Sequence, residues 1–235
     1  MGLNLPAAPA GFRGLQPDVP VVGYWRRLPH WRQVGATYAV TMRLADSLPH
    51  DKIEWLFQAK SHLERTAARG CSTGKRCPTR EDERWSRTVA RYLEKWLDAG
   101  YGECLLRQAC HRATLHDSLL HFHRERYDLS GFVIMPNHCH AVIRPFRGEK
   151  LEALLGVIKG FAARGIQSSL GRTGQLWEEE TYDRIVRDED HLYLALRYLA
   201  ENPRRANLPP HEAEVWFDPS WIEQGWGWKT EWSVP

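Results

Sequence analysis

Two histidines separated by a single residue are the part of this sequence best suited to chemistry. They lie in Met135-Pro-Asn-His-Cys-His140, between two short apolar runs. The Pro-Asn dipeptide before them favours a turn, because Pro fixes φ and Asn tolerates unusual φ. Side chains alternate across a strand, so His138 and His140 should point to one face and Cys139 to the other. Imidazoles are common metal ligands, and the spacing therefore predicts half of a metal site.

The same spacing is also compatible with a purely structural pair of histidines. The turn that precedes the pair favours the metal interpretation, because it would aim both rings in one direction. A second pair with this spacing, His121 and His123, stands in a helical pattern. Residues two apart on a helix differ by roughly 200° around the axis. We therefore expect that second pair to lie on the surface and not to share a metal.

A phenol and an amide one helical turn apart form the second chemical feature. Asp188 is a suitable N-cap for a last helix, expected from Glu189 to about Glu201 and ending before Pro203. Tyr198 and Asn202 then lie together at the edge of its buried stripe. They could face the two histidines across a sheet. The alternative is a Tyr ring packed on the core edge and an Asn that ends a helix. The residues of the stripe are Leu192, Ala195, Leu196 and Leu199.

Four of the five cysteines form two pairs, each with five residues between its members. A zinc site is conceivable, but paired zinc ligands usually stand two to four residues apart. We expect free thiols instead. The four residues are Cys71, Cys77, Cys104 and Cys110.

Basic residues around the last helix could bind phosphates, although a solvated charged face is the simpler explanation. They are Arg184, Arg187, Arg204 and Arg205. Five tryptophans follow Leu208 and could stack on bases, with packing back onto the domain as the alternative.

Composition limits the class of protein. A chain of 235 residues with 43% hydrophobic content can bury one sizeable core, and its net charge of +3 is compatible with a nucleic-acid partner without requiring one. No apolar stretch reaches the roughly 20 residues that span a bilayer, so no membrane partner is expected. The absence of a secretory pattern and the odd number of cysteines indicate a cytoplasmic protein.

The expected elements alternate between strands and helices. Residues 1–20, rich in Pro, Gly and Ala, suggest a flexible arm. The main domain should cover 21–208, with a helical insertion at about 71–102, and a Trp-rich tail should occupy 209–235. We expect a basic, aromatic turn at 24–31, strands at 36–44, 132–134 and 141–143, a short run at 182–186, helices at 52–69, 81–99, 102–124 and 151–164, and a loop at 165–174.

In this order, the motifs resemble those of the REP-associated tyrosine transposases, which belong to the insertion-sequence type of single-tyrosine HUH nucleases. The resemblance spans most of residues 24–208. Its motifs are Leu28-Pro-His-Trp31, Gly35-Ala-Thr-Tyr-Ala-Val-Thr-Met-Arg-Leu44, Met135-Pro-Asn-His-Cys-His140, Lys159-Gly-Phe-Ala-Ala-Arg164, Tyr182-Asp-Arg-Ile-Val-Arg-Asp-Glu189 and Arg197-Tyr-Leu-Ala-Glu-Asn-Pro203.

The resemblance implies an α+β fold, a ferredoxin/RRM-like antiparallel sheet with helices. It implies that His138, His140 and Asn202 hold Mg²⁺ or Mn²⁺ and that Tyr198 attacks single-stranded or hairpin DNA to form a 5′-phosphotyrosine. It adds Lys159 and Arg164 to the expected DNA-binding residues. The expected state is a monomer or a homodimer.

This chain departs from the family pattern in two places, and other nucleophiles and other functions are still possible. The insertion is foreign to compact relatives, and Cys139 replaces the usual hydrophobic residue between the histidines. Tyr182 and Tyr193 are rival nucleophiles, although neither has an amide partner at helical spacing on its own flank. A hairpin-binding protein without catalysis and a metallo-phosphodiesterase that uses water are the competing functions.

Overall fold

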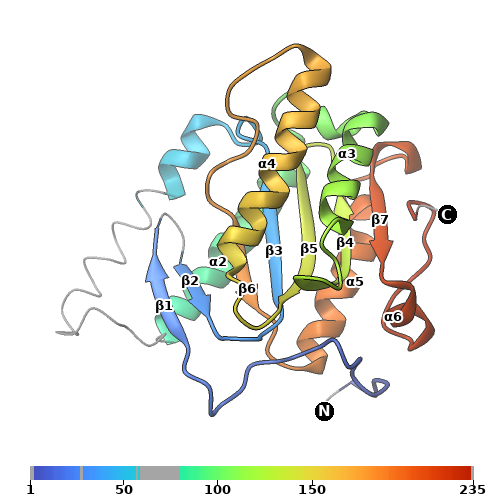
Figure 1. Ribbon diagram of the computed structural model, residues 1–235. Helices are drawn as coiled ribbons and strands as arrows, with labels where there is room; N and C mark the ends of the chain where they lie inside the picture. The colour runs from blue at the N-terminus through green and yellow to red at the C-terminus, as the bar shows by residue number, and fades with distance from the viewer. Residues whose placement is uncertain (1–2, 27–28, 57, 59–79, 234–235) are drawn as a thin grey trace.

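A five-stranded antiparallel sheet forms the centre of the computed structural model, which describes residues 3–26, 29–56, 58 and 80–233 (Figure 1). Its strand order is β6-β3-β5-β4-β7. The strands are β3 (Tyr38–Arg43), β4 (Tyr127–Ile134), β5 (His138–Pro145), β6 (Tyr182–Ile185) and β7 (Glu214–Phe217). A separate hairpin pairs β1 (Val22–Trp25) with β2 (Pro29–Arg32), where a basic turn was expected.

Helices cover both faces of the sheet. In the view of Figure 1, α3 (Ala109–Leu120) and α4 (Leu151–Leu170) lie in front, and α5 (Glu189–Arg205) and α2 (Arg80–Asp98) lie behind. The strands β3, β4, β5 and β6, with helical connections from β3 to β4 and from β5 to β6, follow the split β-α-β pattern of ferredoxin-like folds. The expected α+β class is confirmed. The remaining described elements are the helical residues 50–56 and 58, α6 (Pro219–Glu223) and short 3₁₀ turns at Leu105–Arg107 and Pro210–Glu212.

The sheet separates two apolar cores. On the front face, Cys139 and its alternate neighbours on β5 pack under α3 and α4. On the back face, Val142 packs with Leu192, Leu196 and other residues of α5. The predicted alternation along 138–143 is therefore confirmed, and both histidines are placed on the back face.

Three predicted boundaries are wrong. The last helix continues through Pro203 to Arg205, because a proline in the final turn removes a single backbone donor. The helix expected at 151–164 runs on through Gly165, where a Cβ would stand 2.7 Å from Thr114 Cγ2 of α3. The helix expected at 102–124 is broken after its 3₁₀ turn, because Gln108 is extended and caps α3.

The Trp-rich segment is built into the same sheet. Its strand β7 pairs with β4, where Gly131 leaves room for Phe217: a Cβ on that glycine would lie 2.6 Å from the ring. Trp221, Trp226 and Trp232 are buried. The tryptophans therefore pack onto the domain.

The N-terminal segment, expected to be flexible, also makes contacts with the domain. Phe12 is buried, and the backbone N–H of Leu15 donates to the carbonyl of Arg187 at 2.8 Å. The backbone of Arg13 accepts from Thr37 at 2.8 Å. These bonds connect the segment to the residue before β3 and to the loop after β6.

No helix in the described ranges is long and apolar enough to cross a membrane. Cys71 and Cys77 lie outside the described residues. Of the four paired cysteines, the structure therefore describes only Cys104 and Cys110. Cys104 is buried and Cys110 is exposed, and both are free thiols.

Candidate active site

The two histidines of β5 lie side by side on the back face of the sheet. His138 is completely buried and His140 is 5% exposed. Their ring centroids are 4.6 Å apart, with the planes at 78°. The strand alternation predicted this common direction, and the tertiary structure buries both rings.

Asn137 determines which nitrogen of His138 is available. Its Oδ1 lies 2.7 Å from His138 Nδ1, and its Nδ2 donates to the carbonyls of Leu97 (3.3 Å) and Tyr101 (3.0 Å). Because Nδ2 is the donor of this amide, Oδ1 accepts from the Nδ1–H of His138. The Nε2 of His138 therefore keeps its lone pair, and it is buried with no hydrogen-bond partner.

His140 connects the sheet to α5. Its Nδ1 lies 2.8 Å from Thr41 Oγ1 of the neighbouring strand. Its Nε2 lies 3.4 Å from the hydroxyl oxygen of Tyr198, and the two ring centroids are 5.1 Å apart at 79°. When Nδ1–H donates to Thr41, Nε2 can accept a hydrogen bond from the phenolic O–H.

The amide of Asn202 completes the group. Asp188 caps α5 by accepting from the backbone of His191, as predicted. Tyr198 and Asn202 follow on one flank, and the Asn202 amide lowers the pKa of the Tyr198 phenol. Asn202 is 1% exposed, and its Oδ1 has no partner.

The chemistry of these atoms fits a divalent cation. An unpaired buried polar atom costs free energy unless a ligand satisfies it, and both His138 Nε2 and Asn202 Oδ1 are in that state. Two imidazole nitrogens and one amide oxygen suit Mn²⁺ and are tolerated by the harder Mg²⁺. Within the described ranges, no group of three His, Cys, Asp or Glu side chains could hold a metal ion, so the amide is essential to this assignment.

Burial also sets the charge of the site. It lowers the pKa of His138, with His140 as a smaller cause, and it lowers the pKa of His140 to about 3, with help from the charge of Arg205. Both rings are therefore neutral and have a free lone pair at pH 7. Burial, followed by the carboxylates of Glu94 and Asp98, raises the pKa of the Tyr198 phenol far above its usual value. Arg205 opposes this effect, with its Cζ 5.1 Å from the centre of the Tyr198 ring.

A cavity of about 350 Å³ gives access to the phenol. It is bounded by β3, β5, β6, α5 and α2, and its lining includes His140, Tyr198 and Glu94. Tyr182 also lines it, but that ring belongs to a core cluster with α2. Tyr193 packs against Trp228 instead, with ring centroids 5.6 Å apart.

Comparisons with known proteins add a distant similarity. No protein-family model matches the chain, and no curated protein matches it. Among solved structures, the chain is similar to a REP-associated tyrosine transposase bound to a REP hairpin, at 14% sequence identity and a TM-score of 0.39. The similarity covers 77% of this chain and 73% of that one. A similarity of this size carries no conclusion about activity.

The six basic residues expected to bind DNA do not form one surface. Arg184 lines the Tyr198 cavity, and Arg205 lies over the Tyr198 ring. Lys159 belongs to α4, on the other face of the sheet. The other three side chains are exposed: Arg164, Arg187 and Arg204.

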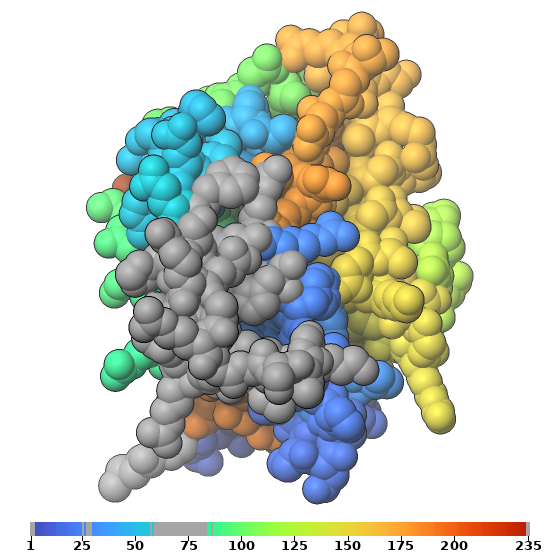
Figure 2. Space-filling model, turned by 90° about the vertical axis from the view of Figure 1, so that its left-hand side faces the viewer, coloured from blue at the N-terminus to red at the C-terminus, as the bar shows by residue number. Residues whose placement is uncertain are grey.

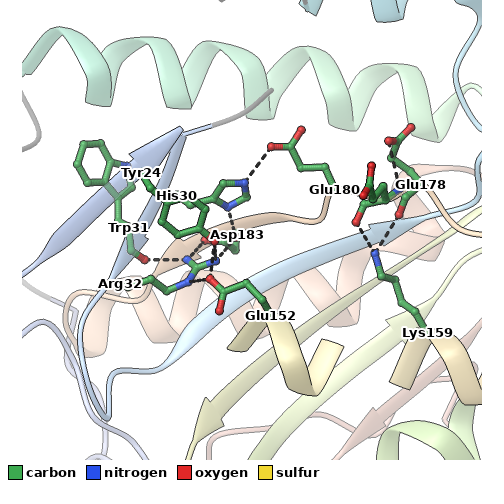
Figure 3. Close-up of polar contacts among 10 residues, drawn as sticks. Tyr24, His30, Trp31, Arg32, Glu152, Lys159, Glu178, Glu180 and Asp183 are labelled. Atoms are coloured by element: carbon green, nitrogen blue, oxygen red, sulfur yellow. Dashed lines mark hydrogen bonds and ion pairs between the residues drawn. The ribbon is translucent and has the colours of Figure 1, made fainter. Parts of the chain in front are cut away.

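Lys159 lines a second cavity, of about 600 Å³, between the β1–β2 hairpin, α4 and residues 174–181. Figure 2 shows the hairpin (blue) beside α4 (yellow) on this side of the molecule. Figure 3 shows Lys159 donating to the carbonyls of Glu178 (2.9 Å) and Glu179 (2.8 Å), and His30 between two carboxylates. The His30 contacts are 2.6 Å to Asp183 and 2.9 Å to Glu180. The two His30 contacts attach the hairpin to residues 180–183.

Reasoning from the sequence missed the residues that support the site. Asn137 was expected only to form a turn, although its position directly before His138 was a usable signal. Thr41 could have been placed only with the pairing of β3 and β5, which sets it opposite His140. Glu94 and Asp98 lie in the insertion, and nothing in the sequence indicates that their helix packs beside Tyr198.

Proposed function

We propose that this chain cuts and rejoins single-stranded DNA, including hairpin DNA, through a covalent phosphotyrosine. Tyr198 is the proposed nucleophile, and His138, His140 and Asn202 are the proposed ligands of Mg²⁺ or Mn²⁺. One observation carries the proposal. The ligand atoms His138 Nε2 and Asn202 Oδ1 are buried without a hydrogen-bond partner. They belong to the same group of side chains as Tyr198, whose hydroxyl oxygen lies 3.4 Å from His140 Nε2.

The reaction would proceed by in-line attack of the Tyr198 oxygen on a phosphorus atom of the DNA strand. The new Oη–P bond forms as the P–O3′ bond breaks; the phenol gives up its proton to solvent and the departing O3′ takes one up from solvent, which leaves a 5′-phosphotyrosine and a free 3′-hydroxyl. The phosphoester is conserved, so the 3′-hydroxyl can attack it later and restore the phenol without ATP. When bound, a divalent cation would polarise the scissile phosphate and stabilise the charge that develops on it.

The residues around the phenol would control its ionisation. In the absence of DNA, burial and the two carboxylates of α2 keep Tyr198 protonated. Arg205 favours the phenolate, and His140 Nε2 accepts from the hydroxyl until a bound cation would take up its lone pair. The neutral state of both histidines suits them to ligate a cation at pH 7.

The test is incubation with single-stranded hairpin oligonucleotides from the flanks of its own gene, with Mg²⁺ or Mn²⁺. A 5′-phosphotyrosine leaves the protein on the downstream fragment. A substrate labelled at its 3′ end should therefore give a labelled protein band on a denaturing gel, and one labelled at its 5′ end should give only a shorter oligonucleotide.

The two competing functions give different gels. Cleavage of both substrates without any labelled protein would indicate a metallo-phosphodiesterase that uses water. Binding without cleavage would indicate a hairpin-binding protein that has no catalytic activity. Either result would refute the role of Tyr198.

A further inference from the structure

The helix α2 presents two different sides. Its inner side contributes Ala90 and Glu94 to the Tyr198 cavity. The adjoining side carries four exposed basic side chains: Arg84, Arg87, Arg91 and Lys95. At 100° per residue these four fall within a sector of roughly 80° around the helix axis. We call this sector the α2 basic face.

Positive charge is concentrated on this face. The whole of α2 contains five cations and five acidic residues, but residues 84–95 contain four of the cations and only one acidic residue, Glu94. An aromatic ring stands beside them, because Tyr92 is 38% exposed and Arg91 Cζ lies 5.9 Å from its centre. Alternating cations and exposed rings suit a strand of nucleic acid, whose phosphates and bases they contact respectively.

The α2 basic face begins at the rim of the Tyr198 cavity. Arg91 precedes Glu94 by three residues and Arg87 precedes it by seven, so both lie on the same side of the helix as that cavity-lining residue. Arg184 of β6 lines the cavity as well. A strand that entered the cavity would therefore meet cations on more than one wall.

We propose that the α2 basic face binds the phosphates of the single strand that adjoins the scissile phosphate. This inference rests on the proposed function, since it assumes that DNA enters the Tyr198 cavity. A single strand fits better than a duplex, because the cavity has a volume of only about 350 Å³ and the neighbouring ring could stack only on an unpaired base. The insertion would thus add a DNA-binding wall to the catalytic domain.

The experiment compares two variants that each lose three positive charges. The test variant is R84Q/R91Q/K95Q. The control is R147Q/K150Q/K229Q, whose three side chains are also exposed but lie outside α2. Binding of a fluorescent single-stranded hairpin oligonucleotide is measured by anisotropy at several salt concentrations, without added divalent cation, and adduct formation is recorded separately.

Each lost phosphate contact should reduce the slope of log K against log salt by about 0.7 for a single strand. The test variant should therefore show a slope smaller by about 2 and an affinity about tenfold weaker or more near 0.1 M salt. The control should stay within about threefold of wild type, and all three proteins should melt at the same temperature.

Equal affinity and slope in the test variant and wild type would overturn the inference while leaving the proposed function intact, provided that wild type forms the adduct. An equal loss in both variants would also overturn it, because the effect would then come from overall charge. If wild type itself binds no DNA, the proposed function fails and the inference fails with it.

Discussion

The hydroxyl oxygen of Tyr198 lies 3.4 Å from Nε2 of His140, although 58 residues separate the two in the chain. This contact joins α5 to β5 and brings the phenol to the pair of buried histidines. The amide of Asn202, one helical turn further along α5, lowers the pKa of the same phenol. The predictions that follow test what this group of residues does.

The histidines should be required for DNA cleavage and for metal binding. We expect His138→Ala and His140→Ala each to reduce adduct formation below detection, because each removes a proposed ligand nitrogen. His121→Ala, from the other pair with the same spacing, is the matched control and should retain full activity. Circular dichroism would verify folding, and calorimetry with Mn²⁺ would report binding directly. Full cleavage by the His138→Ala/His140→Ala double variant with Mg²⁺ or Mn²⁺ would refute the assignment.

Tyr198→Phe should eliminate the covalent adduct while hairpin binding persists, because it removes one oxygen atom and keeps the ring. Tyr182→Phe is the informative comparison, since Tyr182 lines the same cavity. It should leave adduct formation within about tenfold of wild type. If Tyr198→Phe still forms the adduct and Tyr182→Phe does not, the nucleophile is Tyr182.

Asn137→Ala should weaken Mn²⁺ binding by about 10–100-fold, the usual effect of removing a group that orients a ligating histidine. The variant loses the acceptor that holds the Nδ1–H of His138, so Nε2 no longer has a defined protonation. It also loses two bonds to the end of α2 and its following loop. Titration calorimetry measures the affinity, and unchanged binding would show that Asn137 has no orienting role.

The His30 contacts should make stability depend on pH. Burial lowers the pKa of His30, but the hydrogen bonds to Asp183 and Glu180 outweigh it and raise the pKa above 6.5. Folding therefore favours the protonated ring. This contribution is fully present below pH 6.5 and is lost as the pH rises through the folded-state pKa.

Thermal melts of wild type and His30→Ala between pH 6 and 9 test this directly. At pH 6 the variant should be less stable by about 3 kcal/mol, since it removes two hydrogen bonds from the charged ring to buried carboxylates. The difference between the two proteins should shrink as the pH rises. A difference that stays constant or grows would contradict the prediction.

The purified protein should contain no stoichiometric zinc. Cys104 donates its thiol to the carbonyl of Gly100 at 3.3 Å, and Cys110 is exposed on α3. Elemental analysis is the measurement. One zinc per chain that is lost in Cys71→Ser/Cys77→Ser would establish the four-cysteine site instead.

The sequence by itself determined how residues of the site are arranged within one strand or one helix. The alternation of β5 predicted the common face of His138 and His140, and the helical period predicted the neighbouring positions of Tyr198 and Asn202. The cap at Asp188 was also predicted correctly. In each of these cases, backbone geometry alone relates residues that are close in sequence.

Only the tertiary structure decided which elements meet. Glu94 and Lys159 are each a single charged residue on a helix, yet α2 brings the first beside Tyr198 and α4 puts the second on the opposite face of the sheet. The addition of β7 to the sheet next to β4 was likewise not visible in the tryptophan pattern. Packing between distant segments depends on how whole surfaces fit together, and no short window of sequence contains that information.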